Sequence, residues 1–250
     1  MENYTELLSH FQSISLPALI DAQLMNRVDT KFVFRVEDLP ELLIELQDKY
    51  HVLVVNQQRI ANYENIYFDT PSKTFYLDHH NGKDHRYKVR YRKYGNSDNT
   101  FFEVKERCQN RTIKRRIQVD KFQHNLGVKA TTFLIEKFPE LPHLDPQLLN
   151  TYQRITLVNE ELMERFTLDL NISFQFEGKS VYFENIVIAE LKQAYVNRNS
   201  FAYQYMKKQQ LRPSKLSKYC LGTLFTFDQP IKYNNFKYSF NKLKALNNAS

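Results

Sequence analysis

The sequence has 250 residues, of which 42% are hydrophobic and 14% aromatic, and its formal net charge is +7. This composition is typical of a globular protein with a sizeable core and excludes a disordered chain. No apolar run approaches the roughly 18 residues of a membrane-spanning helix, and the first residues lack the basic start and apolar centre of a secretion signal, so we expect a cytoplasmic protein. Cys108 and Cys220 show neither metal-ligand spacing nor a disulfide framework, which fits a reducing compartment.

The positive charge is concentrated in two segments. Residues 83–116 contain 12 Lys and Arg against 4 Asp and Glu, and residues 192–250 contain 11 against 1. The rest of the chain therefore carries a net charge of −11. A bias for solubility would spread the charge more evenly, so the clustering indicates a polyanionic ligand.

The first elements in chain order combine short helices with strands. Residues 1–26 are expected to form two short helices around Pro17, and residues 27–34 a strand. The charged positions of this strand share one face: Arg27, Asp29 and Lys31. Asp38 is expected to cap a helix that runs to about Lys49, with Pro40 tolerated in its first turn and four leucines facing inward. Further strands are predicted near residues 52–57, 61–69 and 73–78.

The run RYKVRYR is the most unusual strand in the sequence. Its alternate residues Arg86, Lys88, Arg90 and Arg92 share one face, and Tyr87, Val89 and Tyr91 share the other. Four like charges side by side repel one another, so this face costs folding free energy unless an anion, carboxylates or water lies against it. Taken alone, the strand is best explained as an exposed, solvated edge.

The same pattern recurs in five later segments, which makes a common ligand the better explanation. The polar face of each segment has the following members: Glu103, Lys105 and Arg107; Thr112, Lys114 and Arg116; Tyr152 and Arg154; Arg165, Thr167 and Asp169; Glu190 and Lys192. We expect Asp169 to pair with Arg165 rather than to bind metal.

The remaining segments complete a prediction of one domain. A mixed helical stretch is expected from Asp120 to about Thr151, a strand over residues 185–194, and helical structure over residues 198–227 with a break at Pro213. The sequence EGKS lacks the earlier glycine of a phosphate-binding loop and is better explained as a hairpin turn. The predicted division is N-terminal helices at 1–26, a core at 27–224 and a C-terminal tail at 228–250 that frays after Asn234.

These elements predict an α+β fold. About eight antiparallel strands, apolar on one face and charged on the other, can bury the apolar face under outer helices and curl until the polar face closes into a barrel with a hydrophilic tunnel. Basic residues in such a tunnel would hold phosphate chains, and its acidic residues would hold a hard divalent cation such as Mg²⁺ or Mn²⁺.

The ordered series RVDTKF, YFDT, KVRYR, FEVKER, TIKRR, YQR, RFTLD, AELK and KLSKY resembles the VTC domain, the polyphosphate polymerase branch of the triphosphate tunnel metalloenzymes in the CYTH-like superfamily. The resemblance covers roughly residues 27–224. No single motif is specific, but nine motifs in family order are hard to obtain by chance.

The resemblance implies a set of site residues. Those implied to act on the phosphates are Lys31, Arg90, Arg92, Lys105, Lys114, Arg154, Arg165 and Lys218. Further candidates for substrate binding are Arg27, Lys88, Arg116, Tyr152, Lys192, Lys215, Ser217 and Tyr219. Glu190 is the implied metal ligand, and Glu103 is a second candidate because it faces the same way. YFDT, with Asp69, is expected to be structural.

The implied reaction is transfer of the γ-phosphate of ATP to a growing polyphosphate chain, with Mn²⁺ or Mg²⁺ as cofactor. Hydrolytic relatives carry ExExK in the first strand, whereas this chain has Arg27 where the first glutamate would be, which favours the polymerase over a triphosphatase. A third alternative is a non-catalytic module that binds polyphosphate or nucleic acid.

Nucleic acid is not the expected ligand, because Tyr87 and Tyr91 lie on the face opposite the arginines and cannot stack on a base held there. Export of the product would need an unidentified membrane partner. Since tunnel charges that repel one another cost stability, Arg90→Ala or Glu190→Ala is expected to remove synthesis without unfolding the protein.

Overall fold

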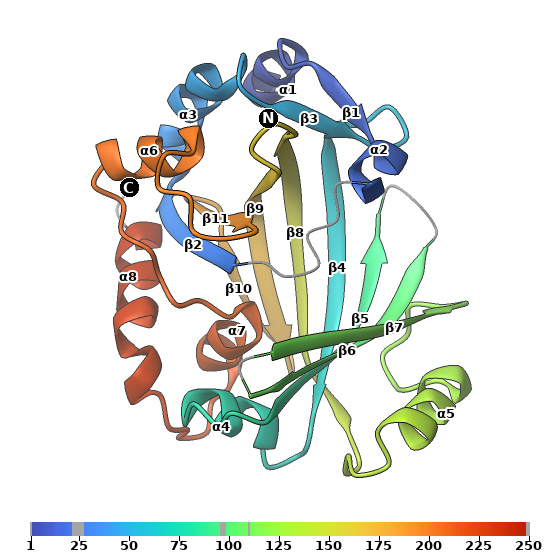
Figure 1. Ribbon diagram of the computed structural model, residues 1–250. Helices are drawn as coiled ribbons and strands as arrows, with labels where there is room; N and C mark the ends of the chain where they lie inside the picture. The colour runs from blue at the N-terminus through green and yellow to red at the C-terminus, as the bar shows by residue number, and fades with distance from the viewer. Residues whose placement is uncertain (1, 22–27, 96–98, 110, 249–250) are drawn as a thin grey trace.

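The computed structural model describes residues 2–21, 28–95, 99–109 and 111–248, and Figure 1 shows its helices and strands. The strands are β1 (Ser13–Ser15), β2 (Val28–Arg35), β3 (His51–Val54), β4 (Ile60–Asp69), β5 (Arg86–Tyr94), β6 (Thr100–Cys108), β7 (Arg111–Val119), β8 (Asp145–Asn159), β9 (Glu164–Phe176), β10 (Lys179–Phe183) and β11 (Ile186–Gln193). The α-helices are α1 (Glu2–Ser9), α2 (Leu16–Asp21), α3 (Leu39–Leu46), α4 (Thr74–His80), α5 (Val128–Lys137), α6 (Phe201–Lys208), α7 (Lys218–Thr226) and α8 (Lys237–Asn248). Two 3-10 turns cover Val36–Asp38 and Asn234–Phe236. No helix among the described residues is long and apolar enough to cross a lipid bilayer.

The strands form one curled sheet, and the predicted antiparallel sheet with outer helices is confirmed. The strand order is β2-β11-β9-β8-β4-β5-β6-β7, with β1, β3 and β10 attached outside this path. All pairs are antiparallel except β1 with β3. In Figure 1, β6 and β7 cross in front of the upright strands β8 and β9, so the sheet has a concave face.

The barrel does not close as predicted, although the predicted number of strands is confirmed. The path from β2 to β7 has eight strands, with three more attached beside it, and within the described chain β2 pairs only with β11 and β7 only with β6. The two ends of the path therefore remain edges. Alternation of residue type along each strand reports which face is buried, but it contains no information on whether the first and last strands meet.

The convex face of the sheet is covered by two groups of helices. Helices α1, α3 and α6 pack over one apolar cluster that contains Phe32, Phe34, Leu168 and Leu191, and α5 packs over a second one behind β5, β6 and β7. The four inward leucines of α3 are fully buried, as their spacing predicts: Leu39, Leu42, Leu43 and Leu46. Asp38 occupies the N-cap position of α3 as predicted, but it also ends a 3-10 turn and its side chain makes no capping hydrogen bond.

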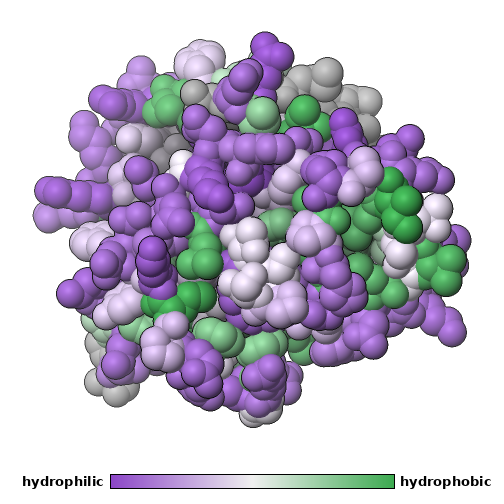
Figure 2. Space-filling model, turned by 90° about the horizontal axis from the view of Figure 1, so that it is seen from below, coloured by the Kyte–Doolittle hydropathy of each residue, from purple (hydrophilic) through white to green (hydrophobic). Residues whose placement is uncertain are grey.

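One end of the concave face is filled by α7 and α8. Gly222 of α7 lies so close to Leu148 and Phe174 that a β-carbon there would be 2.4 Å from the leucine and 2.5 Å from the phenylalanine. Leu243 of α8 is buried in the same cluster, so the expectation that the chain frays after Asn234 is wrong. Figure 2, which views the molecule from below, shows hydrophilic side chains over most of this end, with hydrophobic residues in separate patches.

Two predicted segments take a different structure. Residues 73–78 are not a strand: Lys73 is the N-cap residue of α4, and residues 74–78 belong to this helix. The carboxylate of Asp69 caps its first turn and accepts hydrogen bonds from the backbone N–H groups of Phe75 and Tyr76 at 2.8 and 2.9 Å. Residues 145–151 are not helical but begin β8. Pro146 is tolerated there because it lies at the start of the strand, where the register with β4 shifts.

The alternation is confirmed where the apolar residues between the charged ones are buried, as on β5, β6, β9 and β11, whereas residues 111–116 of β7 are exposed on both faces. Tyr87, Val89 and Val104 are buried under α5, and Phe166 and Leu168 under α3 and α6, so the charged residues between them face the concave side. The alternation of β9 changes at Asn171, where the backbone has φ of 47° and β9 carries one extra residue opposite β8. The predicted hairpin turn at EGKS joins β9 to β10, with Gly178 at φ of 81°.

Candidate functional site

The concave side of β5, β6 and β7 forms what we call the cationic wall. Its eight basic residues are Arg86, Lys88, Arg90, Arg92, Lys105, Arg107, Lys114 and Arg116. Glu103 is the one acidic residue at the same set of inward positions. Strand pairing places these side chains in rows across the wall, so like charges are direct neighbours.

Lys88 is the most deeply placed of three lysines that lie in one row. It is directly opposite Lys105, which is opposite Lys114. The Lys88 ammonium donates to the hydroxyl of Ser217 at 3.0 Å. Burial, with repulsion from Lys105, Lys31 and Arg90, lowers the pKa of Lys88 to about 7. The protein thus holds a cation here whose hydrogen-bond partner is neutral.

Glu103 is enclosed by the cations of its own wall. Arg90 donates to its carboxylate from Nε at 2.9 Å and from Nη2 at 2.7 Å, and Lys114 forms an ion pair with its other oxygen. The Glu103 side chain is 2% exposed. Burial alone would raise the pKa of Glu103, but Arg90, Arg92 and Lys114 hold it well below the usual range.

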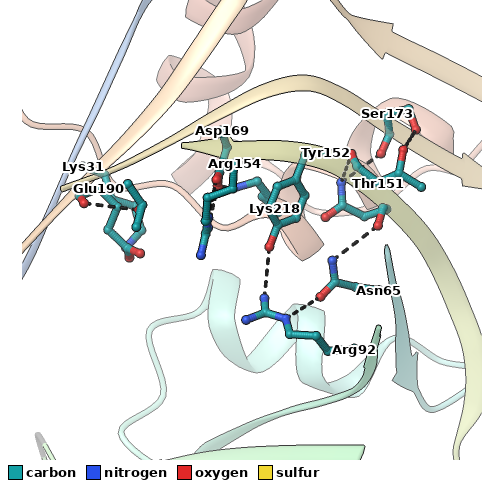
Figure 3. A network of polar contacts seen from close by, with 12 residues as sticks. Lys31, Asn65, Arg92, Thr151, Tyr152, Arg154, Asp169, Ser173, Glu190 and Lys218 are labelled. Carbon is teal, nitrogen blue, oxygen red and sulfur yellow. Dashed lines mark hydrogen bonds and ion pairs between the residues drawn. The ribbon is translucent and has the colours of Figure 1, made fainter. Parts of the chain in front are cut away.

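The opposite side of the concave face, formed by β2, β11, β9 and β8, is here called the mixed wall, because carboxylates alternate with cations on it. Lys31 on β2 lies 3.0 Å from the carboxylate of Glu190 on β11, and Lys192 pairs with the other oxygen of the same carboxylate. Figure 3 shows Lys31 and Glu190 facing each other. The Glu190 side chain is 18% exposed, so it is accessible from the concave side.

Asp169 forms a second buried ion pair on the mixed wall. Arg154 binds it with both ends of its guanidinium, at 2.6 and 2.8 Å, and Lys218 from α7 pairs with Oδ2 (Figure 3). Burial opposes ionisation, yet Arg154 and Lys218 hold the pKa of Asp169 well below its usual range. The expected ion pairing is confirmed but its partner is corrected: Arg154 is directly opposite Asp169, whereas Arg165 lies four residues away on the same strand, roughly 13 Å along it.

Tyr152 and Arg92 connect the two walls. Arg92 donates to the phenol oxygen of Tyr152 at 3.1 Å and to the amide oxygen of Asn65 at 2.9 Å (Figure 3). The ring of Tyr152 is stacked on Tyr63, with centroids 5.1 Å apart, and the Lys218 ammonium lies 4.6 Å from its centre. Although burial opposes ionisation, the surrounding cations lower the pKa of Tyr152. Prediction from sequence missed Tyr63 and Asn65, although their alternation with the buried Ile66 and Phe68 on β4 was a usable signal.

Three consecutive residues at the start of α7 reach three different strands. Ser217 caps the helix and accepts from Lys88 of β5, while Lys218 binds Asp169 of β9. Tyr219 is 2% exposed, and its hydroxyl donates to Asp69 at the end of β4 at 2.6 Å. Asp69 thus has the structural role expected for it. The geometry also gives Tyr219 a structural role instead of a contact with substrate.

The other candidate residues lie at different depths. Arg116 on the edge strand β7 is exposed, with its guanidinium 4.7 Å from the ring centre of Phe101. Lys105 and Lys215 are exposed and Arg165 is half-buried. Arg27 lies outside the described residues.

A model of the VTC domain family matches residues 26–227 of the sequence. The chain belongs to the VTC domain family. No curated protein matches the sequence significantly.

Solved structures with a similar arrangement are very distant in sequence. A candidate adenylyl cyclase from Hippeastrum, described as having a dominant triphosphatase activity, is 11% identical with a TM-score of 0.48, over 80% of this chain and 97% of that one. A candidate adenylate cyclase from Vibrio parahaemolyticus is 15% identical with a TM-score of 0.44, over 78% and 96% of the two chains. The family assignment of this VTC domain rests on the family match and not on these structures.

The donor set of this VTC domain suits a divalent cation that is shared with phosphate. Among the described residues, no group of three His, Cys, Asp or Glu side chains could hold a metal ion by itself. Mg²⁺, however, is usually bound by one or two carboxylates and completed by water and substrate phosphates. Glu190 can supply such a carboxylate. Glu103 is less accessible because Arg90 and Lys114 enclose it.

Proposed function

We propose that this VTC domain protein transfers the γ-phosphate of ATP to a growing chain of inorganic polyphosphate. The observation that carries the proposal is the cationic wall, where eight basic side chains share the inward positions of β5, β6 and β7 with one carboxylate. A chain of phosphates supplies the negative charge that such a surface lacks, and it does so at every unit. Hydrogen bonds from cationic donors to phosphate are among the strong ones in proteins.

The spacing on β5 suits phosphate groups that lie two units apart along an extended chain. Lys88, Arg90 and Arg92 occupy alternate positions of one strand, so their backbones are roughly 6.6 Å apart. Arg154 and Lys218 approach from the opposite wall. Phosphoryl transfer asks mainly for alignment of the attacking and leaving oxygens and for neutralisation of charge on the transferred group, both of which this arrangement can provide.

The carboxylates of the site favour phosphate over water as the acceptor. Attack by water needs a group that positions it and takes its proton, whereas a terminal phosphate is already ionised. Glu103 and Asp169 are poor bases, because each is held by two cations and its pKa lies well below the usual range. The weak basicity of these two carboxylates supports transfer to polyphosphate over hydrolysis.

Glu190 is the residue that we propose as the protein's ligand to Mn²⁺ or Mg²⁺. When bound there, the cation would neutralise charge on phosphate oxygens. Without a bound cation, Lys31 and Lys192 pair with the Glu190 carboxylate and orient it toward the concave side. Both lysines are then placed to bind the same phosphates.

The test is an assay of the purified protein with ATP, Mn²⁺ and a short polyphosphate primer, in which ADP, free phosphate and long polymer are measured together. We expect polymer in amounts that match ADP. Free phosphate without polymer would identify a triphosphatase, and neither product would favour a binding module.

The most informative variant for this assay is Arg92→Met. Arg92 has the neutral partners Asn65 and Tyr152, so its removal leaves no buried carboxylate without a cation. We expect at least a hundredfold loss of activity, which is the size of effect seen when a donor to a developing charge is removed. The matched control is Lys207→Met on the exposed end of α6, which should keep full activity.

A further inference from the structure

The lysine row of the cationic wall runs across the strands toward an open edge of the sheet. Lys88, Lys105 and Lys114 are direct neighbours on β5, β6 and β7, which at a strand spacing of about 4.8 Å places the outer two roughly 10 Å apart. Exposure increases along the row, from the half-buried Lys88 to Lys105 and Lys114, which are exposed. The row thus connects the interior of the concave face with the surface.

The edge at the end of this row is both open and basic. In the described part of the chain β7 pairs only with β6, and residues 111–116 are all exposed. Beyond Lys114, the opposite face of the same strand carries Arg111 and Arg115. The basic surface therefore continues over the edge of the sheet instead of ending at it. Glu103, which binds Lys114, is the one carboxylate at the inward positions of this wall.

We propose that the row Lys88, Lys105 and Lys114 is a lateral track, along which a linear polyphosphate chain leaves the concave face over the edge of β7 and onto Arg111 and Arg115. This inference rests on the proposed function, because it takes the polymer of that reaction as the occupant. A chain bound in this way enters and leaves sideways and need not be threaded past α7 and α8, which fill one end of the concave face.

The direction of the lysine row and the lack of aromatic residues along it favour an inorganic chain over a peptide or a nucleic acid as the ligand. An acidic peptide that added to the edge strand would run parallel to β7 and would not reach Lys88, since the row is perpendicular to the strands. A nucleic acid would find no aromatic platform along the row, because Tyr87, Val89 and Val104 beside these lysines are buried on the other face. A flexible chain with a charge on every unit can follow neighbouring lysines in either direction.

The experiment compares two ligands and two double variants. Affinities for tripolyphosphate and for a long linear polyphosphate of defined length are measured by calorimetry without nucleotide. Arg111→Gln with Arg115→Gln removes two charges beyond the edge, and Lys207→Gln with Lys208→Gln removes two from the exposed end of α6. We expect the first pair to weaken long-chain binding about tenfold, the combined effect of two solvated ion pairs, and to leave tripolyphosphate binding unchanged. The second pair should alter neither.

Any of the following results would contradict the proposed track. An equal loss of long-chain affinity in both double variants would show an effect of net charge alone, and no loss in the first pair would show that the chain does not cross this edge. A single-stranded oligonucleotide that displaced the long polyphosphate at equal charge concentration would overturn the assigned ligand class. Arg115 lies 5.1 Å from the ring centre of Phe138, so Arg115→Gln also removes a packing contact. The single variant Arg111→Gln avoids this contact and therefore tests the loss of charge alone. Failure of the proposed function is distinguishable, because the assay with ATP and primer would then yield no polymer, whereas the track is judged from the binding affinities alone.

Discussion

The two walls of the concave face hold similar side chains in opposite electrostatic situations. On the mixed wall, Arg154, Lys31 and Lys192 each lie against a carboxylate of a neighbouring residue. On the cationic wall, eight basic residues share one carboxylate. On the mixed wall the protein itself supplies the counter-charges. If the proposed function is right, a ligand supplies most of them on the cationic wall, so we expect that wall to cost stability and to provide affinity.

This comparison corrects the expectation that charges on the concave side can be removed without cost to the fold. The expectation still applies to residues such as Lys88 and Arg92, whose hydrogen-bond partners are neutral. Arg90, in contrast, binds the buried carboxylate of Glu103, so Arg90→Ala would combine a loss of affinity with a loss of stability. Variants with neutral partners are the cleaner tests of function.

The largest expected effect is on the mixed wall. Arg154→Met leaves Asp169 buried with Lys218 as its remaining cation, so we expect the free energy of unfolding to fall by about 3 kcal/mol. The measurement is urea unfolding without phosphate. Arg92→Met is the control and should cost less than about 1 kcal/mol, since the hydrogen-bond partners of Arg92 are neutral and Glu103 keeps its ion pairs with Arg90 and Lys114. Equal losses in the two variants would remove the distinction between the walls.

On the cationic wall, Lys88→Met should have the opposite effect on stability. It removes a charge that burial disfavours, so we expect a gain on the order of 1 kcal/mol at pH 6 and a tripolyphosphate affinity about tenfold lower. Thermal unfolding and calorimetry on the same samples measure both quantities. A loss of stability together with the loss of affinity would mean that the bond to Ser217 outweighs the cost of burial.

The same lysine predicts a pH dependence with a defined sign. The pKa of Lys88 is lowered to about 7 from the usual 10.5 of an exposed lysine, so between these values the unfolded chain binds more protons than the folded one. The free energy of unfolding attributable to Lys88 therefore rises with pH from about 7 to about 10.5. Its charged neighbours, Lys105, Lys31 and Arg90, oppose its protonation.

The stability difference between wild type and Lys88→Met, measured by urea unfolding from pH 6 to 9, should accordingly shrink above pH 7. Tripolyphosphate binding at pH 8 should also take up a proton at Lys88, seen by calorimetry in buffers of different ionisation enthalpy and absent from the variant. A stability difference between the two proteins that stayed constant with pH would contradict the lowered pKa of Lys88.

The smallest expected effect is the difference between variants of two tyrosines, Tyr219 and Tyr152, near the junction of the walls. Tyr219→Phe removes a hydrogen bond to Asp69 away from the basic residues and should cost about 1 kcal/mol of stability with unchanged tripolyphosphate affinity. Tyr152→Phe removes a partner of Arg92 and should lower affinity severalfold. Urea unfolding measures the stability of both variants, and calorimetry measures their affinity for tripolyphosphate. A lower affinity in Tyr219→Phe would indicate that Tyr219 contacts the ligand.

Much of the site could be predicted because strand alternation depends on local sequence. The period of two along RYKVRYR and its five companions placed the charged residues on one face, and the buried Val89, Val104 and Leu168 confirm it. Local reasoning failed where tertiary contacts outweigh propensity. Residues 74–80 form a helix because Asp69 caps it, and residues 237–248 form one because Leu243 is buried against the sheet.

The sequence by itself determined the alternation of the strands, the clustering of positive charge and the order of motifs, because each depends on neighbouring residues or on the chain's linear order. The tertiary structure decided which cations meet a carboxylate. Arg154 binds Asp169 because their strands are adjacent, and Lys88 meets Ser217 because the start of α7, a helix that packs on β8 and β9, reaches the side chains of β5. It also decided that β2 and β7 are edges among the described strands, which leaves the lysine row open at one end. Strand register and packing set these contacts, and neither can be read from one segment alone.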